Sequence, residues 1–205
     1  MNSLNALLHE FCPSGVEHKP LGKCCTIIGG GTPSKATPEF YAGSIPWATV
    51  RDMNTLVIHD TEYHITEEAI AKSASNLIPA GSLVISTHVG VGKACILAND
   101  TAINQDLKAV IPQPELLTRY LFHWFLDKSD FLVSKALGST VKGLSLDFVK
   151  SLSIPLPPLP VQEEIVRRLD AMQEVVEALE AELALRRKQY EVVRKSLFAN
   201  LEASQ

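Results

Sequence analysis

The sequence lacks several features that would fix a compartment or a cofactor. No apolar run reaches the roughly 18 residues that a membrane-spanning helix needs. The first fifteen residues have no basic segment and no long apolar stretch, so no signal peptide is expected. The four cysteines, Cys12, Cys24, Cys25 and Cys95, form no CxxC pair, and their spacing gives no disulfide framework. Together these absences favour a cytoplasmic protein with reduced thiols and no membrane association.

An excess of basic residues, common in proteins that bind nucleic acids on their own, is also missing. The 205 residues carry a formal net charge of −4. Residues 1–160 contain 12 Lys or Arg against 14 Asp or Glu, so this region is almost neutral. Binding to DNA would therefore need a local basic patch or the help of a more basic partner.

The motifs of several enzyme classes are absent as well. VGVGKA at 89–94 resembles a phosphate-binding loop, but GxxxxGK[ST] requires Gly at 87 and Ser or Thr at 94, where the chain has Thr87 and Ala94. There is no HExxH pair, no GxSxG motif and no glycine motif or Pro-Pro-aromatic tetrapeptide of a DNA methyltransferase. Turns account for Asp100 and Asp106 better than a nuclease site does. We expect a binding protein without a metal or cofactor of its own.

The first 154 residues combine short β-prone runs, glycine-rich turns and a few helical patterns. Strands are expected around 24–28, 45–50, 83–85, 94–97 and 106–112, and one or two helices are expected after Pro114. Strands and helices do not alternate regularly. The pattern therefore predicts a mixed, β-rich α+β domain at 1–154.

A proline-rich segment at 155–160 joins this domain to a helical region at 161–205. Its four prolines favour an extended, semi-rigid linker, and Pro160 can also occupy the first turn of a helix. Glu163 and Glu164 follow, where acidic side chains favour a helix N-terminus. From Val161 to Leu201 there is neither proline nor glycine. One long helix is predicted.

Apolar residues in the helical region recur at alternating spacings of four and three, which is the pattern of a coiled coil. Residues 161–184 carry a net charge of −5 and residues 185–201 a net charge of +4. An antiparallel pair would place each acidic half against a basic half. We predict an antiparallel coiled coil with a second copy or with another helix of the same polarity; a helix packed on the protein's own core is the alternative. The predicted seam comprises Ile165, Leu169, Met172, Val176, Leu179, Leu183, Arg186, Tyr190, Val193 and Leu197.

Five polar loops in the first domain mix small residues with a basic or amide side chain: GGGTPSK (29–35), RDMN (51–54), STHVGVGK (86–93), INQD (103–106) and GSTVKG (138–143). Such loops can bring hydroxyls and backbone N–H groups to phosphates, while Arg, Lys, Asn or Gln reach base edges. Each loop taken alone is better explained as an ordinary turn, whereas five such loops in one domain favour a binding surface.

These loops belong to a longer set of segments that resembles a known family. CPSGVEHKPLG, GGGTPSK, YAGSIPWATVRDM, AGSLVIST…GVGKACIL, AINQD and GSTVKGLSLDFVKSLSIPLPPLPVQEEIVRRLD resemble the specificity subunit of type I restriction–modification enzymes. The resemblance covers nearly the whole chain. It is most specific in the last segment, where a short strand, a proline run and the start of a long helix occur together.

The resemblance implies a non-catalytic subunit whose target recognition domain reads one half of a split DNA site. Such subunits dock methyltransferase subunits, which carry S-adenosylmethionine, and the assembly can recruit a restriction subunit. Usual members have two recognition domains and two helical regions packed as an antiparallel coiled coil, whereas this chain has one of each. It is therefore either a natural half-subunit or a truncated product, and a homodimer would rebuild the full arrangement. The alternatives are a coiled-coil scaffold protein that does not bind DNA and a degenerate DNA-modifying enzyme.

Candidate DNA contacts follow from side-chain chemistry within these loops. Arg51, His88, Lys93, Gln105 and Lys142 suit base edges or phosphates, and Thr32, Ser34, Lys35, Ser139 and Thr140 suit backbone positioning. Trp47 is assigned to the core. Arg186, the one charged position of the seam, is expected to meet a glutamate of the other strand and to set the register.

Overall fold

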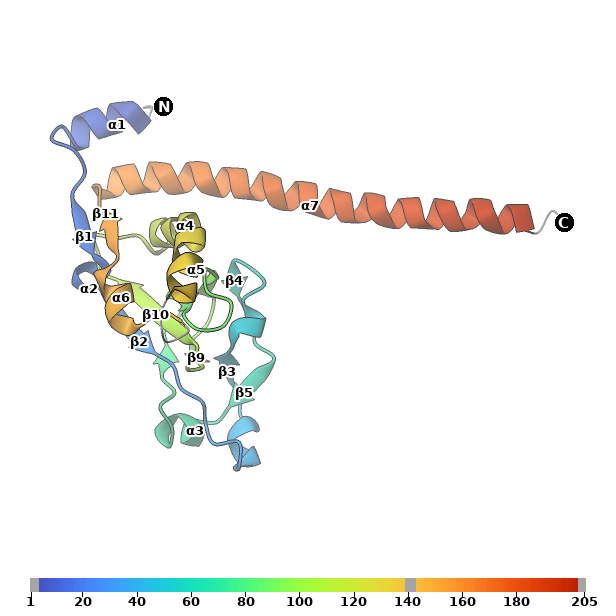
Figure 1. The fold of residues 1–205 in the computed structure, drawn as a ribbon, viewed down its shortest axis with the longest axis horizontal. Coiled ribbons are helices and arrows are strands. Elements are labelled where there is room, and N and C mark those ends of the chain that lie inside the picture. The colour runs from blue at the N-terminus through green and yellow to red at the C-terminus, as the bar shows by residue number, and fades with distance from the viewer. Residues whose placement is uncertain (1–3, 139–142, 203–205) are drawn as a thin grey trace. The chain divides into compact units, whose positions relative to one another are not determined.

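The computed structural model describes residues 4–138 and 143–202, and it divides the chain into two compact units, Met1–Glu164 and Ile165–Gln205 (Figure 1). The first unit contains all the strands. It also holds the shorter helices α1 (Leu4–Phe11), α2 (Leu21–Cys24), α3 (Glu67–Ala71), α4 (Thr118–Asp127), α5 (Ser129–Leu137) and α6 (Leu146–Ser151), with 3₁₀ turns η1 (Pro38–Tyr41) and η2 (Val50–Asp52). The predicted α+β class is confirmed.

Two mixed sheets form the centre of the first unit. The five-stranded sheet has the order β2-β10-β7-β8-β4 and is antiparallel except for the pair β4–β8. Its strands are β2 (Cys25–Gly29), β4 (Val57–Ile58), β7 (Leu83–Ser86), β8 (Ala94–Leu97) and β10 (Leu107–Pro112). The four-stranded sheet has the order β5-β3-β9-β6, with β3 and β9 parallel. Its strands are β3 (Ile45–Ala48), β5 (Tyr63–Ile65), β6 (Leu77–Ile78) and β9 (Thr101–Ile103).

Most of the expected strands occur within one or two residues of their predicted positions. β8 matches the run 94–97, β7 extends one residue beyond the expected segment, and β10 begins one residue later than expected. The region after Pro114 forms α4 and α5, as expected. α4 packs against β7, β8 and β10, because Tyr120, Leu121, Phe122, Trp124 and Phe125 are buried along the helix.

Two clusters of the apolar core lie on these sheets. One cluster joins residues of the five-stranded sheet, such as Val84 and Leu97, to Ala48, Ile78 and Ile103 of the four-stranded sheet. The second cluster, around Trp47 and Ile65, lies on the four-stranded sheet. β9 contributes to both clusters, so it links the two sheets through its buried side chains.

Two strands near the ends of the first unit are paired with each other. β1 (His18–Pro20) and β11 (Ser153–Pro155) form an antiparallel two-stranded ladder in which Lys19 faces Ile154. The chain leaves β11 through three residues without regular structure and then enters α7 (Leu159–Glu202). Half of the predicted linker at 155–160 therefore belongs to the flanking elements, since Pro155 ends β11 and Leu159 and Pro160 are helical. The fixed φ and missing N–H of Pro160 are tolerated in a first turn.

The first turns of α7 are attached to the first unit by a buried glutamine. Gln162 is 0% exposed. Its Oε1 accepts from the N–H of Leu117 at 2.9 Å, and its Nε2 donates to the carbonyl oxygens of Glu115 and Pro157, each at 2.8 Å. The amide oxygen and both amide hydrogens of Gln162 are thus used to fix the start of the helix.

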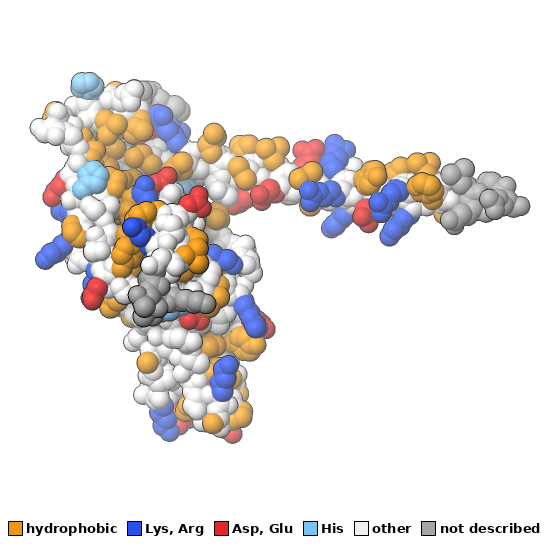
Figure 2. All heavy atoms as spheres, in the orientation of Figure 1, with side chains coloured by type: hydrophobic (Ala, Val, Ile, Leu, Met, Phe, Trp, Pro, Cys, Tyr) orange, Lys and Arg blue, Asp and Glu red, His pale blue; other side chains and the backbone are white. Residues whose placement is uncertain are grey.

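The second unit is the remainder of α7, from Ile165 onward. The seam positions from Leu169 to Leu197 are exposed, and Figure 2 shows hydrophobic side chains at the surface along this helix. The prediction of one long helix is confirmed, although it begins at Leu159 rather than at Val161, so Glu163 and Glu164 fall beyond its first turn. Within the described residues, no helix combines the length and apolar character that crossing a membrane requires.

Candidate nucleic-acid interface

The glycine loop after β2 runs directly along the turn between β9 and β10. The N–H of Gly30 donates to the oxygen of Leu107 at 3.3 Å, and that of Gly31 donates to the oxygen of Ile103 at 3.0 Å. A Cβ on Gly30 would lie 2.1 Å from the carbonyl oxygen of Asn104. Only a residue without a side chain permits this approach, which brings the polar residues 32–35 next to the turn.

The β9–β10 turn itself is held by its own side chains. The oxygen of Asn104 accepts from the N–H of Leu107 at 3.1 Å, and its Oδ1 accepts from the N–H of Asp106 at 3.1 Å. The oxygen of Asp106 accepts both the N–H of Thr87 at 2.9 Å and its hydroxyl at 3.0 Å. These bonds fix the turn and leave Gln105 exposed at its tip.

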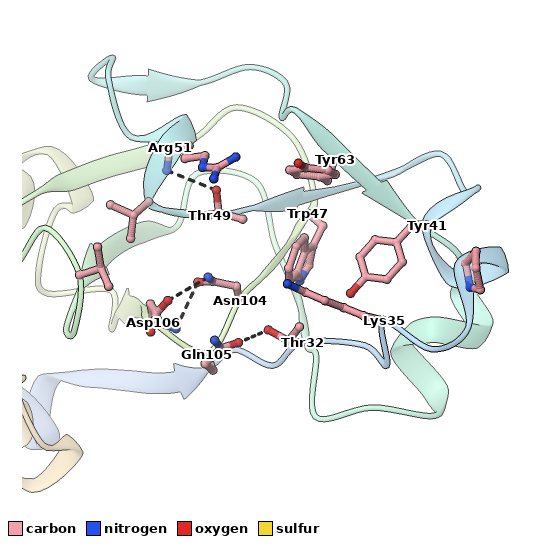
Figure 3. A pocket seen from close by; sticks show the side chains of 13 residues that line it. Thr32, Lys35, Tyr41, Trp47, Thr49, Arg51, Tyr63, Asn104, Gln105 and Asp106 are labelled. Carbon is pink, nitrogen blue, oxygen red and sulfur yellow. Dashed lines mark hydrogen bonds between the residues drawn. The ribbon is translucent and has the colours of Figure 1, made fainter.

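Gln105 has two further contacts. The hydroxyl of Thr32 donates to its Oε1, as the dashed line in Figure 3 shows. The ammonium of Lys108 donates to the main-chain oxygen of Gln105 at 3.0 Å and to that of Leu107 at 3.2 Å. Partial burial lowers the pKa of Lys108, and nearby Asp106 opposes that shift. Both the side chain and the backbone of Gln105 are therefore restrained.

Three aromatic rings form one wall of the site. Trp47 on β3 packs edge-on against Tyr41 at 5.9 Å and against Tyr63 at 6.4 Å between ring centroids (Figure 3). Its indole N–H donates to the oxygen of Gly31 at 3.1 Å, and the hydroxyl of Tyr41 donates to Pro33 at 2.8 Å. Burial raises the pKa of Tyr41. Trp47 is only 6% exposed, so it belongs to the core as expected while one edge lines the site.

Arg51 enters the site from a capped 3₁₀ turn. Thr49 caps η2 by accepting the N–H of Arg51 at 3.2 Å, and Asp52 accepts the N–H of Thr49 at 2.7 Å. The guanidinium of Arg51 lies 3.7 Å from the carboxylate of Glu62, and its side chain is 74% exposed. An exposed pair of this kind holds the guanidinium weakly, so it remains accessible to a phosphate or a base.

These elements enclose an open cavity of about 690 Å³. Four residues chosen from the sequence line it, namely Thr32, Lys35, Arg51 and Gln105, and they come from three separate loops. In Figure 3 the side chain of Lys35 extends toward Trp47. The other lining residues are Pro38, Tyr41, Trp47, Thr49, Val50, Tyr63, Val89, Asn104 and Asp106.

Three other candidates lie outside this cavity. His88 precedes the lining residue Val89 and its Nδ1 is 3.1 Å from the hydroxyl of Thr87. The ammonium of Lys93 donates to Asn54 at 3.1 Å. Ser34 accepts the N–H of Ala36 at 3.3 Å, which is an ordinary turn contact. Ser139, Thr140 and Lys142 lie outside the described residues.

The sequence reasoning did not select the aromatic wall or the polar residues beside Gln105. Asn104 and Asp106 were inside the chosen INQD segment, so the loop signal was present without residue-level resolution. Tyr41 and Tyr63 had no comparable signal, because the pairing of β3 with β5 that brings Tyr63 opposite Trp47 spans sixteen residues. The pairing of β3 with β5, which a local sequence pattern does not reveal, places Tyr63 in the site.

The chemistry of the cavity is suited to recognition. In the parts of the chain described, 4–138 and 143–202, no cluster of three His, Cys, Asp or Glu side chains is placed to hold a metal ion. The available groups are two exposed cations, amide and hydroxyl groups on fixed turns, and an aromatic wall. Cations and hydroxyls suit phosphates, and amides suit the edges of bases.

Comparison with known proteins identifies a family that matches this chain. Residues 13–185 match the family described as type I restriction modification DNA specificity domain. The chain is 37% identical over 203 residues to the Escherichia coli type I restriction enzyme EcoR124I/EcoR124II specificity subunit, covering 94% of this chain and 50% of that protein. It is 29% identical over 182 residues to the Methanocaldococcus jannaschii MjaIX specificity subunit, covering 85% and 40%.

A solved structure agrees with the fold. The crystal structure of the HsdS subunit from Thermoanaerobacter tengcongensis superposes with a TM-score of 0.67 at 25% identity, covering 86% of this chain and 44% of that one. The chain thus spans about half the length of the relatives that it matches. It belongs to the family of type I restriction–modification DNA specificity domains.

Proposed function

We propose that this chain is a DNA specificity subunit of a type I restriction–modification system. Its recognition region binds one half of a bipartite DNA site, and it docks methyltransferase subunits that carry out the chemistry; a restriction subunit joins that assembly. The protein itself does not catalyse a reaction. Family membership supports this assignment, since the named relatives are specificity subunits.

The single observation that carries the DNA-binding part is the convergence of loops on one cavity. Residues from 32–35, η2 and the β9–β10 turn, far apart in the sequence, bring two cations and one exposed amide to one rim. The first 160 residues are nearly neutral, so two cations supply only part of the attraction to phosphate. A basic methyltransferase that wraps the duplex would supply the remainder.

The test is duplex binding by the protein reconstituted with its methyltransferase. Lys35→Gln combined with Arg51→Gln should weaken binding and reduce the dependence of log affinity on log salt by about two, because each lost phosphate contact removes about one released counterion. Lys23→Gln, an exposed lysine on α2 that does not line the cavity, is the control. Equal binding by both variants would remove the cavity from the interface. A wild-type complex that shifts no duplex would favour the scaffold alternative.

We further propose that α7 pairs with a second copy in antiparallel orientation. The ten seam positions are arranged symmetrically about residue 181. Antiparallel pairing about that point would form five kinds of layer, each occurring twice, pairing Ile165 with Leu197, Leu169 with Val193, Met172 with Tyr190, Val176 with Arg186, and Leu179 with Leu183. Every seam residue then gains a partner, and the −5 half lies beside the +4 half.

Two features act against this pairing, and both are local. Glu180 and Glu182 flank the centre and would approach their own copies, and like charges at such positions are mildly unfavourable. Arg186 lies within 3.4 Å of Glu182 of its own helix, so its predicted partner in the other strand stays a prediction. Exposed pairs contribute up to about 1 kcal/mol each. The apolar-rich layers outweigh these terms.

Cysteine cross-linking separates the orientations. In a Cys12→Ser background, which removes the one cysteine that is not buried, Glu182→Cys should cross-link to itself, because it lies beside the two-fold axis. Leu197→Cys should cross-link only when mixed with Ile165→Cys. Self-linking by Leu197→Cys would instead show a parallel pair, and a monomer in sedimentation at high concentration would overturn the homodimer.

A further inference from the structure

The turn that carries Gln105 presents one amide in a fixed orientation. Asn104 and Asp106 on either side are held by the turn bonds described above, and Lys108 holds the main-chain oxygen of Gln105. The turn packs on the glycine loop so closely that Gly30 leaves no room for a Cβ. A side chain at the tip of such a turn keeps its position relative to the rest of the cavity.

Thr32 determines which end of that amide is free. Its hydroxyl donates to Oε1 of Gln105, so the carbonyl oxygen of the amide is already engaged inside the protein. The side chain of Gln105 is exposed, and Figure 3 shows it at the rim of the cavity with Thr32 beside it. That bond uses one of the two lone pairs of the oxygen and fixes the amide, so the NH₂ group, which is a donor only, is the end that is wholly free for a ligand.

We infer that Gln105 is a specificity-determining residue that donates from Nε2 to an acceptor on a base edge, and that Thr32 is the positioning residue that sets this donor orientation. The inference rests on the proposed function. It differs from the expectation drawn from the sequence, in which Thr32 was assigned to backbone positioning on the DNA. Here Thr32 acts through Gln105.

The donors and acceptors on the base edges determine which bases an amide in this orientation can bind. In the major groove guanine offers N7 and O6 as acceptors, adenine offers N7 and thymine offers O4, whereas cytosine offers only its N4 amino donor. A glutamine with both ends free can bind adenine at N6 and N7 together. With one lone pair of its carbonyl held by Thr32, Gln105 is disfavoured from that bidentate mode and donates to any edge that bears an acceptor, which cytosine does not.

A phosphate contact explains the geometry less well. The amide is uncharged, and two exposed cations, Lys35 and Arg51, already line the same cavity. A phosphate oxygen would be bound more strongly by either of these. The internal bond that engages the acceptor end of the amide also changes which base edge the amide can read.

The experiment sequences the methylation sites made by the complex of this protein with its methyltransferase and S-adenosylmethionine. It also measures duplex affinity with each of the four base pairs at each position. Gln105→Glu converts the donor into an acceptor and should change the permitted base at one position of the half-site, with a change in discrimination of about 5- to 150-fold. Thr32→Val frees the carbonyl end and should improve adenine at that position alone. Thr32→Ser, which keeps the hydroxyl, should restore the wild-type preference.

Gln113→Glu is the matched control, because Gln113 is exposed, does not line the cavity and undergoes the same change of charge. The inference is wrong if Gln105→Glu retains the wild-type site, or if it weakens all sequences equally, as the loss of a phosphate contact would. It is also wrong if Thr32→Val changes no base preference. A wild-type complex that recognises no sequence would overturn the proposed function as well, so the two failures are distinguishable.

Discussion

Replacing Gln162 by methionine tests how the long helix is attached. Methionine fills nearly the same volume but cannot bond to Leu117, Glu115 or Pro157, which would leave three main-chain groups without their partner. A buried polar group left unpaired costs about 1–3 kcal/mol. The bond to Pro157 is buried, whereas the other two are partly buried and can regain water. We therefore expect a loss of about 2–5 kcal/mol in the free energy of unfolding.

Urea unfolding followed by tryptophan fluorescence suits this measurement. Both tryptophans, Trp47 and Trp124, lie in the first unit, so the signal reports the part to which Gln162 is bonded. In a thermal scan the same loss should lower Tm by about 5–15 °C. The control is Gln173→Met, which removes a single 3.3 Å bond to Glu177 and should change stability by less than about 0.5 kcal/mol. Equal midpoints for the two variants would refute the reasoning.

Three further predictions concern the first unit. Gly30→Ala should cost several kcal/mol and weaken DNA binding, because its Cβ would meet an oxygen of the β9–β10 turn at 2.1 Å; Gly29→Ala, whose nearest neighbour is 3.8 Å away, should be mild in the same unfolding and binding assays. Burial raises the pKa of Cys95 to about 11 from 9.0. The unfolded thiol ionises first, so stability should fall by about 2–3 kcal/mol between pH 9 and pH 11, and Cys95→Ala should flatten that fall in pH-dependent unfolding. Trp47→Phe removes the indole bond to Gly31 and should cost about 1–3 kcal/mol, measured by thermal unfolding; an unchanged Tm would contradict it.

Local patterns predicted the elements that are locally determined. β8 and the long helix could be located because their signals are local: apolar residues beside glycine turns for β8, and a heptad pattern without proline for the helix. The two-residue strands β4 and β6 could not, because so short a strand exists only through its neighbour in the sheet. α1 was also not predicted. It buries no residue in this chain, and no apolar periodicity had been assigned to it.

The candidate site shows the same division between local and tertiary information. Thr32 and Gln105 were both selected from the sequence, but their hydrogen bond joins residues 73 positions apart, and no spacing rule predicts it. Tyr41 and Tyr63 meet Trp47 only after β3 and β5 have paired. The chemistry of each loop could therefore be predicted, whereas the orientation of its groups depends on contacts between loops.

The ladder between β1 and β11 has a consequence for how such a protein can change. Residues 18–20 and 153–155 are hydrogen-bonded neighbours, so the chain segment from α2 to α6 begins and ends at the same two-stranded ladder. Gene exchange with breakpoints in these two short strands would replace the whole segment between them, including the candidate site, as one unit. The helix start at Leu159 would remain, and Gln162 would keep its bond to Pro157, while the incoming segment would have to supply the main-chain groups at positions 115 and 117 to which Gln162 also bonds. Under the proposed function, such an exchange would change the DNA sequence that is read while leaving α7 unchanged.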